Sequence, residues 1–151
     1  MSSRGIRNNN PGNIDYNKRQ FGLDPWVGEN GPETRPNGSE GRFTTFTSPV
    51  FGIRALCKIL LTYYRLRKAE DGSEIDTVKE VIDRWAPPSE NDSASYARVV
   101  RLALGVRPGQ FVNLEDPETL MTMATAIIKH ENGEQPYDEA TIAEGARLAL
   151  A

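Results

Sequence analysis

The sequence predicts an α+β fold that is predominantly α-helical and forms a single domain over residues 1–151. Three observations support this prediction. A chain of 151 residues is long enough to bury a sizeable core in one domain. Hydrophobic residues make up 38% and charged residues 26%, which is typical of a globular protein. The composition also changes near residue 48, which divides a loop- and β-rich lobe (1–48) from a helical lobe (49–151).

The first lobe is dominated by residues that favour turns. Residues 1–48 contain seven Gly, four Pro and seven Asn. The best strand candidate is 41–47, which is rich in β-branched and aromatic residues, and Val27 is expected on a partner strand. Aromatic residues such as Trp26 and Phe43 need a buried environment, so we expect this lobe to be folded rather than disordered.

About five helices are expected in the second lobe. The first begins with Ser48 as N-cap and Pro49, and runs to about Ala69. Its apolar residues cover most of its circumference, which is typical of a buried central helix. The other four have clear start and stop signals, with N-caps at Thr77, Ser93, Asp116 and Asp138, and they are expected at 78–85, 94–104, 117–131 and 139–150.

Charge and cysteine content exclude several classes of protein. The formal net charge of −3 provides no basic surface for binding nucleic acid. The single Cys57 cannot form an intramolecular disulfide, and with His130 as the sole histidine no Cys/His zinc site can be built. We therefore expect neither a metal nor a cofactor.

Targeting and membrane segments are not expected either. No apolar stretch follows Met1, so the chain start does not match a signal peptide. The longest apolar stretch, 50–66, is interrupted by Arg54, Lys58 and Arg65, which argues against a membrane span. The sequence predicts a soluble protein made in the cytoplasm.

The segment with the strongest catalytic signal is the end of the helix predicted over 117–131. Glu131 continues the apolar face of this helix, together with Leu120, Ala124 and Ile127. A carboxyl group there is partly removed from water and close to the negative end of the helix dipole. Such a position favours the protonated form that a general acid needs. The alternative is a Glu that extends into solvent at a frayed helix end.

A second candidate segment, 84–96, is a loop stiffened by two prolines. An aromatic ring beside carboxylate and amide groups suits a carbohydrate, because the ring stacks on a sugar face while polar groups reach its hydroxyls. The side chains that this loop presents are Trp85, Glu90, Asn91 and Tyr96. The alternative is a rigid turn with Trp85 in the core.

A third segment, 4–14, contains three consecutive asparagines before Pro-Gly. It is dense in amide donors and acceptors, which makes Asn10 and Asn13 candidates for ligand binding. The alternative is ordinary turn chemistry.

Taken together and in this order, these segments resemble a group of bacteriophage virion proteins with a lysozyme-like, lytic transglycosylase-type fold. The resemblance covers nearly the whole chain and is carried by 5–14, 43–55, 84–91 and 130–133. Residues 124–133 also look like the helix end of lytic transglycosylases and bacterial N-acetylglucosaminidases, where an apolar helix ends in a catalytic Glu. Asn132 stands where those enzymes usually have Ser.

The order of the motifs differs from that of the glucosaminidases. In those enzymes an Asn-rich stretch, an aromatic strand and a long helix follow the catalytic Glu, whereas here similar pieces precede Glu131. We interpret this order as a circular permutation, which is physically accessible because domain termini often lie close together.

The resemblance implies a peptidoglycan-degrading enzyme that cleaves the β-1,4 bond between N-acetylmuramic acid and N-acetylglucosamine. Glu131 would act as a single general acid and base, with Glu90 as the alternative acid and Glu90 or Glu40 as a distant second carboxylate. The residues expected to bind saccharide are Trp85, Asn91, Tyr96, Asn10, Asn13, Asn132 and Tyr137. The expected partners are peptidoglycan glycan strands and other virion proteins, with no nucleic acid and no membrane insertion.

Two other functions remain open at the level of sequence. The same fold could carry a peptidoglycan endopeptidase, although Cys57 lies in the most apolar helix and makes a poor nucleophile with His130. The domain could also be a non-catalytic virion or glycan-binding protein, since fold does not determine activity. In each case we expect the protein in a phage virion or the host cytoplasm, acting at the bacterial cell wall or in the periplasm.

Overall fold

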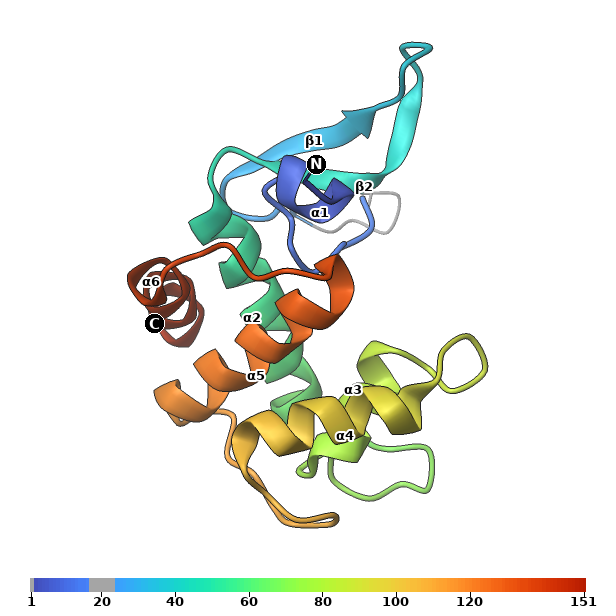
Figure 1. The fold of residues 1–151 in the computed structure, drawn as a ribbon, viewed down its shortest axis with the longest axis vertical. Coiled ribbons are helices and arrows are strands. Elements are labelled where there is room, and N and C mark those ends of the chain that lie inside the picture. The colour runs from blue at the N-terminus through green and yellow to red at the C-terminus, as the bar shows by residue number, and fades with distance from the viewer. Residues whose placement is uncertain (1, 17–23) are drawn as a thin grey trace.

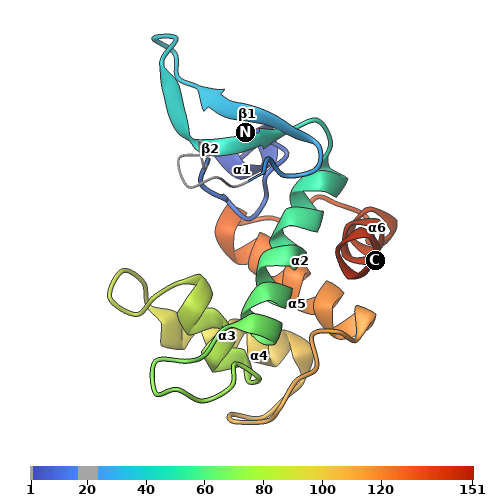
Figure 2. The ribbon, with the colours of Figure 1, turned by 180° about the vertical axis from the view of Figure 1, so that it is seen from behind.

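The computed structural model describes residues 2–16 and 24–151 (Figure 1). Within them the chain forms six helices and one two-stranded sheet, a predominantly helical α+β arrangement. The sheet and the first short helix lie at one end of the molecule, and four of the other helices gather around α2 below them (Figures 1 and 2).

The N-terminal lobe contains α1 (Arg4–Arg7), β1 (Glu29–Thr34) and β2 (Glu40–Phe46). The strands pair antiparallel, with two register irregularities between Glu29 and Thr34. The strand prediction near 41–47 is confirmed for β2. Val27 precedes the partner strand instead of belonging to it, because Gly28 has a positive φ of 76° and β1 begins only at Glu29. The four-residue α1 was not predicted, since it is too short to show a periodic pattern.

Helix α2 (Pro49–Leu66) connects the two lobes and runs through the centre of the molecule (Figures 1 and 2). As predicted, Ser48 caps its start, and its side chain accepts a hydrogen bond from the Val50 N–H. The helix ends three residues before the predicted Ala69, because Arg67 adopts an extended conformation.

The helical lobe contains four further helices, whose bounds agree with the predicted ones to within one residue. Asp92, rather than Ser93, caps the second of them, and its carboxylate accepts from the Ser95 N–H. These helices are α3 (Val78–Trp85), α4 (Ser93–Leu104), α5 (Pro117–Asn132) and α6 (Glu139–Leu150).

The main hydrophobic core lies among α2 to α6. Helix α6 packs closely on α2 at Gly145, where a Cβ atom would come within 2.5 Å of the Ile53 side chain. The largest fully buried side chains include Leu56, Leu60, Ile82, Leu120, Met123 and Ile127. None of the helices in the described part of the chain combines the length and apolar character needed to cross a membrane.

The N-terminal lobe is attached to this core through its asparagine-rich loop. The carbonyl oxygen of Asn9 lies so close to Gly52 of α2 that a Cβ atom there would overlap it. The loop also contacts the C-terminal end of α5, where the Asn132 side-chain amide donates to the Pro11 carbonyl at 2.8 Å. Loop 8–13 therefore lies against the helix end that carries Glu131.

Candidate functional site

A cleft of about 610 Å³ lies between the two lobes and has Glu131 in its wall. Its size falls in the range of about 300–1,000 Å³ that is usual for ligand sites. Two of its walls come from opposite lobes: the loop and strand residues 12–15 and 42–43, and residues 84–87 and 90–91 at and after the end of α3. Of the predicted site residues, those that line it are Glu131, Glu90, Trp85, Asn91 and Asn13.

Glu131 is held in place by a chain of hydrogen bonds. Tyr96 donates its hydroxyl hydrogen to Glu131 Oε2 at 2.9 Å, and Trp85 Nε1–H donates to the Tyr96 oxygen at 3.1 Å. Glu131 Oε1 has no hydrogen-bond partner among residues 2–16 and 24–151. One carboxyl oxygen is thus fixed while the other remains accessible for a ligand.

Tyr96 is buried, with 2% of its surface exposed, and does not line the cleft. Its ring stacks on the ring of His130, with centroids 3.7 Å apart. Burial raises the pKa of Tyr96, and the neighbouring Glu131 carboxylate raises it further. The Tyr96 hydroxyl therefore stays protonated at ordinary pH values and keeps its hydrogen bond to Glu131. Tyr96 therefore contacts Glu131 from outside the cleft lining and does not face the open space of the cleft.

Two of the asparagines that were predicted to bind a ligand use their side-chain amides for hydrogen bonds within the protein. Asn10 is fully buried: its Nδ2 donates to the carbonyls of Ile14 and Thr44, and its Oδ1 accepts from the Ile14 N–H. Asn132 donates to the carbonyls of Pro11 and Ile128 and accepts from Ser3. Their amides are occupied in holding the N-terminal loop against the end of α5.

Asn13 differs from Asn10 and Asn132. It adopts a left-handed conformation with φ of 51°, lies in the cleft wall, and its Oδ1 is buried without a hydrogen-bond partner. This oxygen is enclosed by protein atoms, and a Cβ on Gly5 would lie 2.9 Å from it, so it is an unsatisfied buried group and not an open acceptor at the cleft surface.

The Pro87-Pro88 loop carries the other wall of the cleft. Glu90 and Asn91 are exposed there, and Asn91 donates to the Pro87 carbonyl at 3.2 Å. The Trp85 ring is half-buried and lies close to Gly12, which connects this wall to the asparagine-rich loop.

Tyr137 lies outside the cleft. It is half-buried against the main core, and its hydroxyl is buried without a partner. Burial, followed by the charge of Glu134, raises the pKa of Tyr137 to about 12. Glu40 does not line the cleft either.

Several cleft residues were not predicted from the sequence. They include Asp15 and Arg42, which form an ion pair at 2.7 Å, and Phe43, whose ring lies 4.6 Å from the Arg4 guanidinium and 5.1 Å from that of Arg42. The only sequence signal for Arg42 and Phe43 was the strand pattern of 41–47, and Asp15 had none. They reach the cleft because Asp15 pairs with Phe43 in an isolated bridge beside β2.

No family model matches the chain. Over 144 residues, however, the chain is 35% identical to Protein P5 of Pseudoalteromonas phage PM2. This similarity covers 95% of the chain and 80% of the phage protein.

The chain belongs to the Protein P5 family.

Coverage of 95% means that the family relationship includes both lobes and the cleft between them. The bacteriophage part of the resemblance seen in the sequence is thereby supported by a relative from a phage, whereas the name of that relative states no activity.

Other potentially reactive groups of this P5 family member lie outside the cleft. Cys57 is completely buried in α2, and burial raises its pKa to about 12, so its thiol is a poor nucleophile. His130 is exposed and does not line the cleft, and its ring stacks on that of Tyr96. Among residues 2–16 and 24–151, no group of three or more His, Cys, Asp or Glu side chains is arranged to hold a metal ion.

Proposed function

We propose that the protein is a phage virion enzyme that degrades peptidoglycan by cleaving the β-1,4 bond between N-acetylmuramic acid and N-acetylglucosamine. The observation that carries this proposal is Glu131 in the wall of an inter-lobe cleft, at the end of an apolar helix and fixed by Tyr96. The lysozyme-like, lytic transglycosylase-type resemblance of the sequence and the relationship to a phage protein both agree with it.

In the proposed reaction, protonated Glu131 donates its proton from Oε1 to the glycosidic oxygen, and the bond from this oxygen to the anomeric carbon breaks. Tyr96 keeps Oε2 in place during this step. The resulting carboxylate then accepts the proton of the muramic acid C6 hydroxyl, whose oxygen bonds to the anomeric carbon and closes a 1,6-anhydro ring. One carboxyl group thus serves as acid and then as base.

The remaining cleft residues would bind the glycan strand. The Trp85 ring offers an apolar face for a sugar, and Asn91 and Asn13, which line the cleft, are the amide side chains nearest to its hydroxyl and N-acetyl groups. Other virion proteins would be the partners that deliver the enzyme to the cell wall.

A hydrolytic version of this reaction has one specific observation in its favour. Glu90 and Asp15 also line the cleft, so a second carboxylate is available to activate water or to attack the sugar. Glu90 is exposed and Asp15 is paired with Arg42, so neither is as well positioned as Glu131. The thiol-based endopeptidase receives no such support, because Cys57 is buried outside the cleft.

Digestion of purified Gram-negative sacculi, with mass analysis of the released fragments, tests the proposal. We expect turbidity to fall and 1,6-anhydro disaccharides to appear. Ordinary reducing ends would establish hydrolysis and direct attention to Glu90 and Asp15. New amino groups would establish peptide cleavage, and binding to sacculi without any release would establish a non-catalytic protein; either result contradicts the proposal.

A further inference from the structure

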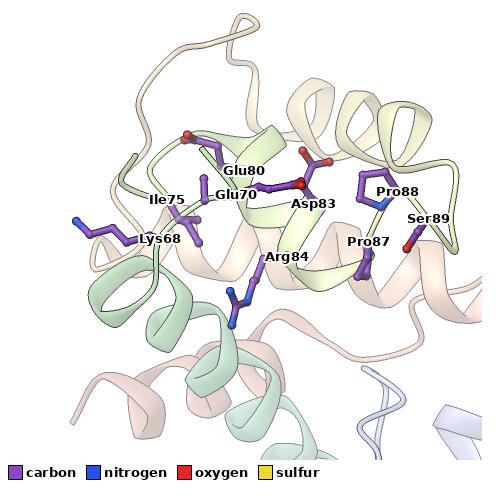
Figure 3. Close-up of a pocket in the computed structure, with 10 residues that line it drawn as sticks. Lys68, Glu70, Ile75, Glu80, Asp83, Arg84, Pro87, Pro88 and Ser89 are labelled. Carbon is purple, nitrogen blue, oxygen red and sulfur yellow. The ribbon is translucent and has the colours of Figure 1, made fainter. Parts of the chain in front are cut away.

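A second cavity, of about 600 Å³, is shown with its lining residues in Figure 3. It is formed by 68–70 after α2, by one side of α3, and by 87–89 of the proline-stiffened loop. Arg84 and Pro87 line both the cavity and the cleft. A ligand bound beside Glu131 could therefore continue past Arg84 into this cavity.

Arg84 stands at the junction with its charge unpaired. Its side chain is directed toward α2, away from Glu80 and Asp83 (Figure 3). The guanidinium lies 5.6 Å from the centroid of the Tyr63 ring, and no carboxylate of residues 2–16 or 24–151 pairs with it. Contact with an aromatic face restrains a guanidinium while leaving its edge donors accessible. Such a group is well suited to bind a carboxylate through two parallel hydrogen bonds.

Most other charges of the cavity already have partners. Lys68 is paired with Glu74, and Asp83 accepts from Lys79 at 2.6 Å. The Glu80 carboxylate accepts hydrogen bonds from the cap of α3. The exception is Glu70, an exposed carboxylate with no partner within the described part of the chain.

The cavity therefore presents one unpaired cation at the cleft and one unpaired anion elsewhere in its lining. The sugar rings of a glycan strand do not carry a pair of oppositely charged groups that could bind to this cation and this anion together. A short peptide that branches from the sugar, with a free carboxylate and a free amino group, would pair with both.

We propose that this cavity binds the peptide branch carried by muramic acid, with Arg84 binding a peptide carboxylate and Glu70 a peptide ammonium group. This inference rests on the proposed function, because it requires the glycan strand to occupy the cleft. Binding of the peptide would make the enzyme selective for glycan strands that still carry their peptides.

The test compares two substrates: glycan strands with their peptides, and the same strands after an amidase has removed the peptides. We expect the wild-type protein to have a higher kcat/KM on the peptide-bearing strands. Arg84→Met removes one charge-assisted contact and should lower this preference about tenfold. Glu70→Gln should lower it by a smaller factor. Arg98→Met removes an exposed arginine from α4 that lines neither cavity, and should keep the wild-type preference.

A binding measurement makes the result independent of turnover. Calorimetric titration of the Glu131→Gln protein with a disaccharide, and with the same disaccharide bearing its peptide, should show tighter binding of the second. Adding Arg84→Met should reduce this difference about tenfold, and adding Glu70→Gln as well should remove the rest.

Two outcomes separate the inference from the function on which it rests. Cleavage of both strands with equal kcat/KM, or an equal loss on both in Arg84→Met, overturns peptide binding and leaves the glycan-cleaving function intact. Absence of cleavage and of binding with every strand and fragment overturns both.

Discussion

The two lobes that enclose the cleft are stabilised by different interactions. The helical lobe has an extended apolar core in which side chains such as Leu60 and Ile127 are completely buried. The N-terminal lobe has a small apolar cluster built on Ile14 and Phe46, and depends instead on hydrogen bonds and charge.

Two polar groups illustrate this dependence. Asn10 joins the loop to β2 from a fully buried position. Glu33 of β1 accepts hydrogen bonds from Arg4, Asn8 and the Phe43 N–H. The comparison shows that apolar packing holds the cleft wall that carries Glu131 in place. Polar contacts hold the opposite wall, so the stability of that lobe should depend on pH.

The largest change in stability is expected from Leu60→Ala in the helical core. Leu60 is fully buried in α2, and truncating it should lower the free energy of unfolding by about 3 kcal/mol, equally at pH 7 and pH 3. Urea denaturation at both values measures this. Leu66→Ala, at an exposed position of the same helix, should change stability little. Equal losses in the two variants would contradict the proposed core.

A smaller loss is expected from Asn10→Ala in the N-terminal lobe. The substitution leaves buried carbonyl and N–H groups without partners, which should cost about 2 kcal/mol. Asn30→Ala, at an exposed residue of β1, is the control. Hydrogen exchange should show faster exchange in loop 8–14 and β2 for Asn10→Ala, with α5 unchanged. Uniform loss of protection across both lobes would show that the lobes are not stabilised separately.

The pH dependence of the N-terminal lobe should come mainly from Glu33. Its pKa is lowered from 4.5 to about 2, chiefly by its hydrogen bonds with Arg4 and also by the contacts from Phe43 and Asn8, which together outweigh the opposing effect of burial. Because the folded-state pKa is lowered, the stabilisation is fully present above about pH 4.5 and is lost as pH falls toward 2.

Glu33→Gln should therefore lower stability at pH 7, on the order of 1–2 kcal/mol, and have progressively less effect toward pH 2. Urea denaturation over this range measures the difference from wild type. A constant difference at all pH values would show that the ion pair with Arg4 does not carry the effect.

The smallest change in stability is expected from Tyr96→Phe, about 1 kcal/mol for the loss of the hydrogen bonds that the Tyr96 hydroxyl donates to Glu131 and accepts from Trp85. If the cleft is catalytic, the same substitution should lower the rate of sacculus digestion several-fold and shift its pH profile, because Tyr96 fixes Glu131. Tyr137→Phe is the matched control, since that buried hydroxyl has no partner to lose. Identical pH profiles for wild type and Tyr96→Phe would contradict a positioning role.

The helical lobe could be predicted closely from the sequence. Its caps, such as Thr77 and Asp116, and its apolar periodicity are local signals, and they placed four helices to within one residue. The position of Glu131 on the apolar face of its helix was likewise visible in the spacing.

The N-terminal lobe and the partners of Glu131 could not be predicted in the same way. Asn10 and Asn13 have the same side chain and lie three residues apart. Asn10 is fully buried and hydrogen-bonded within the protein, whereas Asn13 lines the cleft. Tyr96 was expected to contact sugar, and only the packing of α4 against α5 places its hydroxyl on Glu131. Long-range contacts decide these roles, and no local pattern encodes them.

The most direct test of the central claim is the rate at which Glu131→Gln clears purified sacculi, compared with Glu134→Gln, which makes the same change at an exposed residue after α5. Circular dichroism should show both variants folded. We predict that Glu131→Gln lowers the rate at least about 100-fold, the usual contribution of a general acid, whereas Glu134→Gln retains wild-type activity. A folded Glu131→Gln protein that clears sacculi at the wild-type rate would contradict the assignment of Glu131 as the catalytic acid.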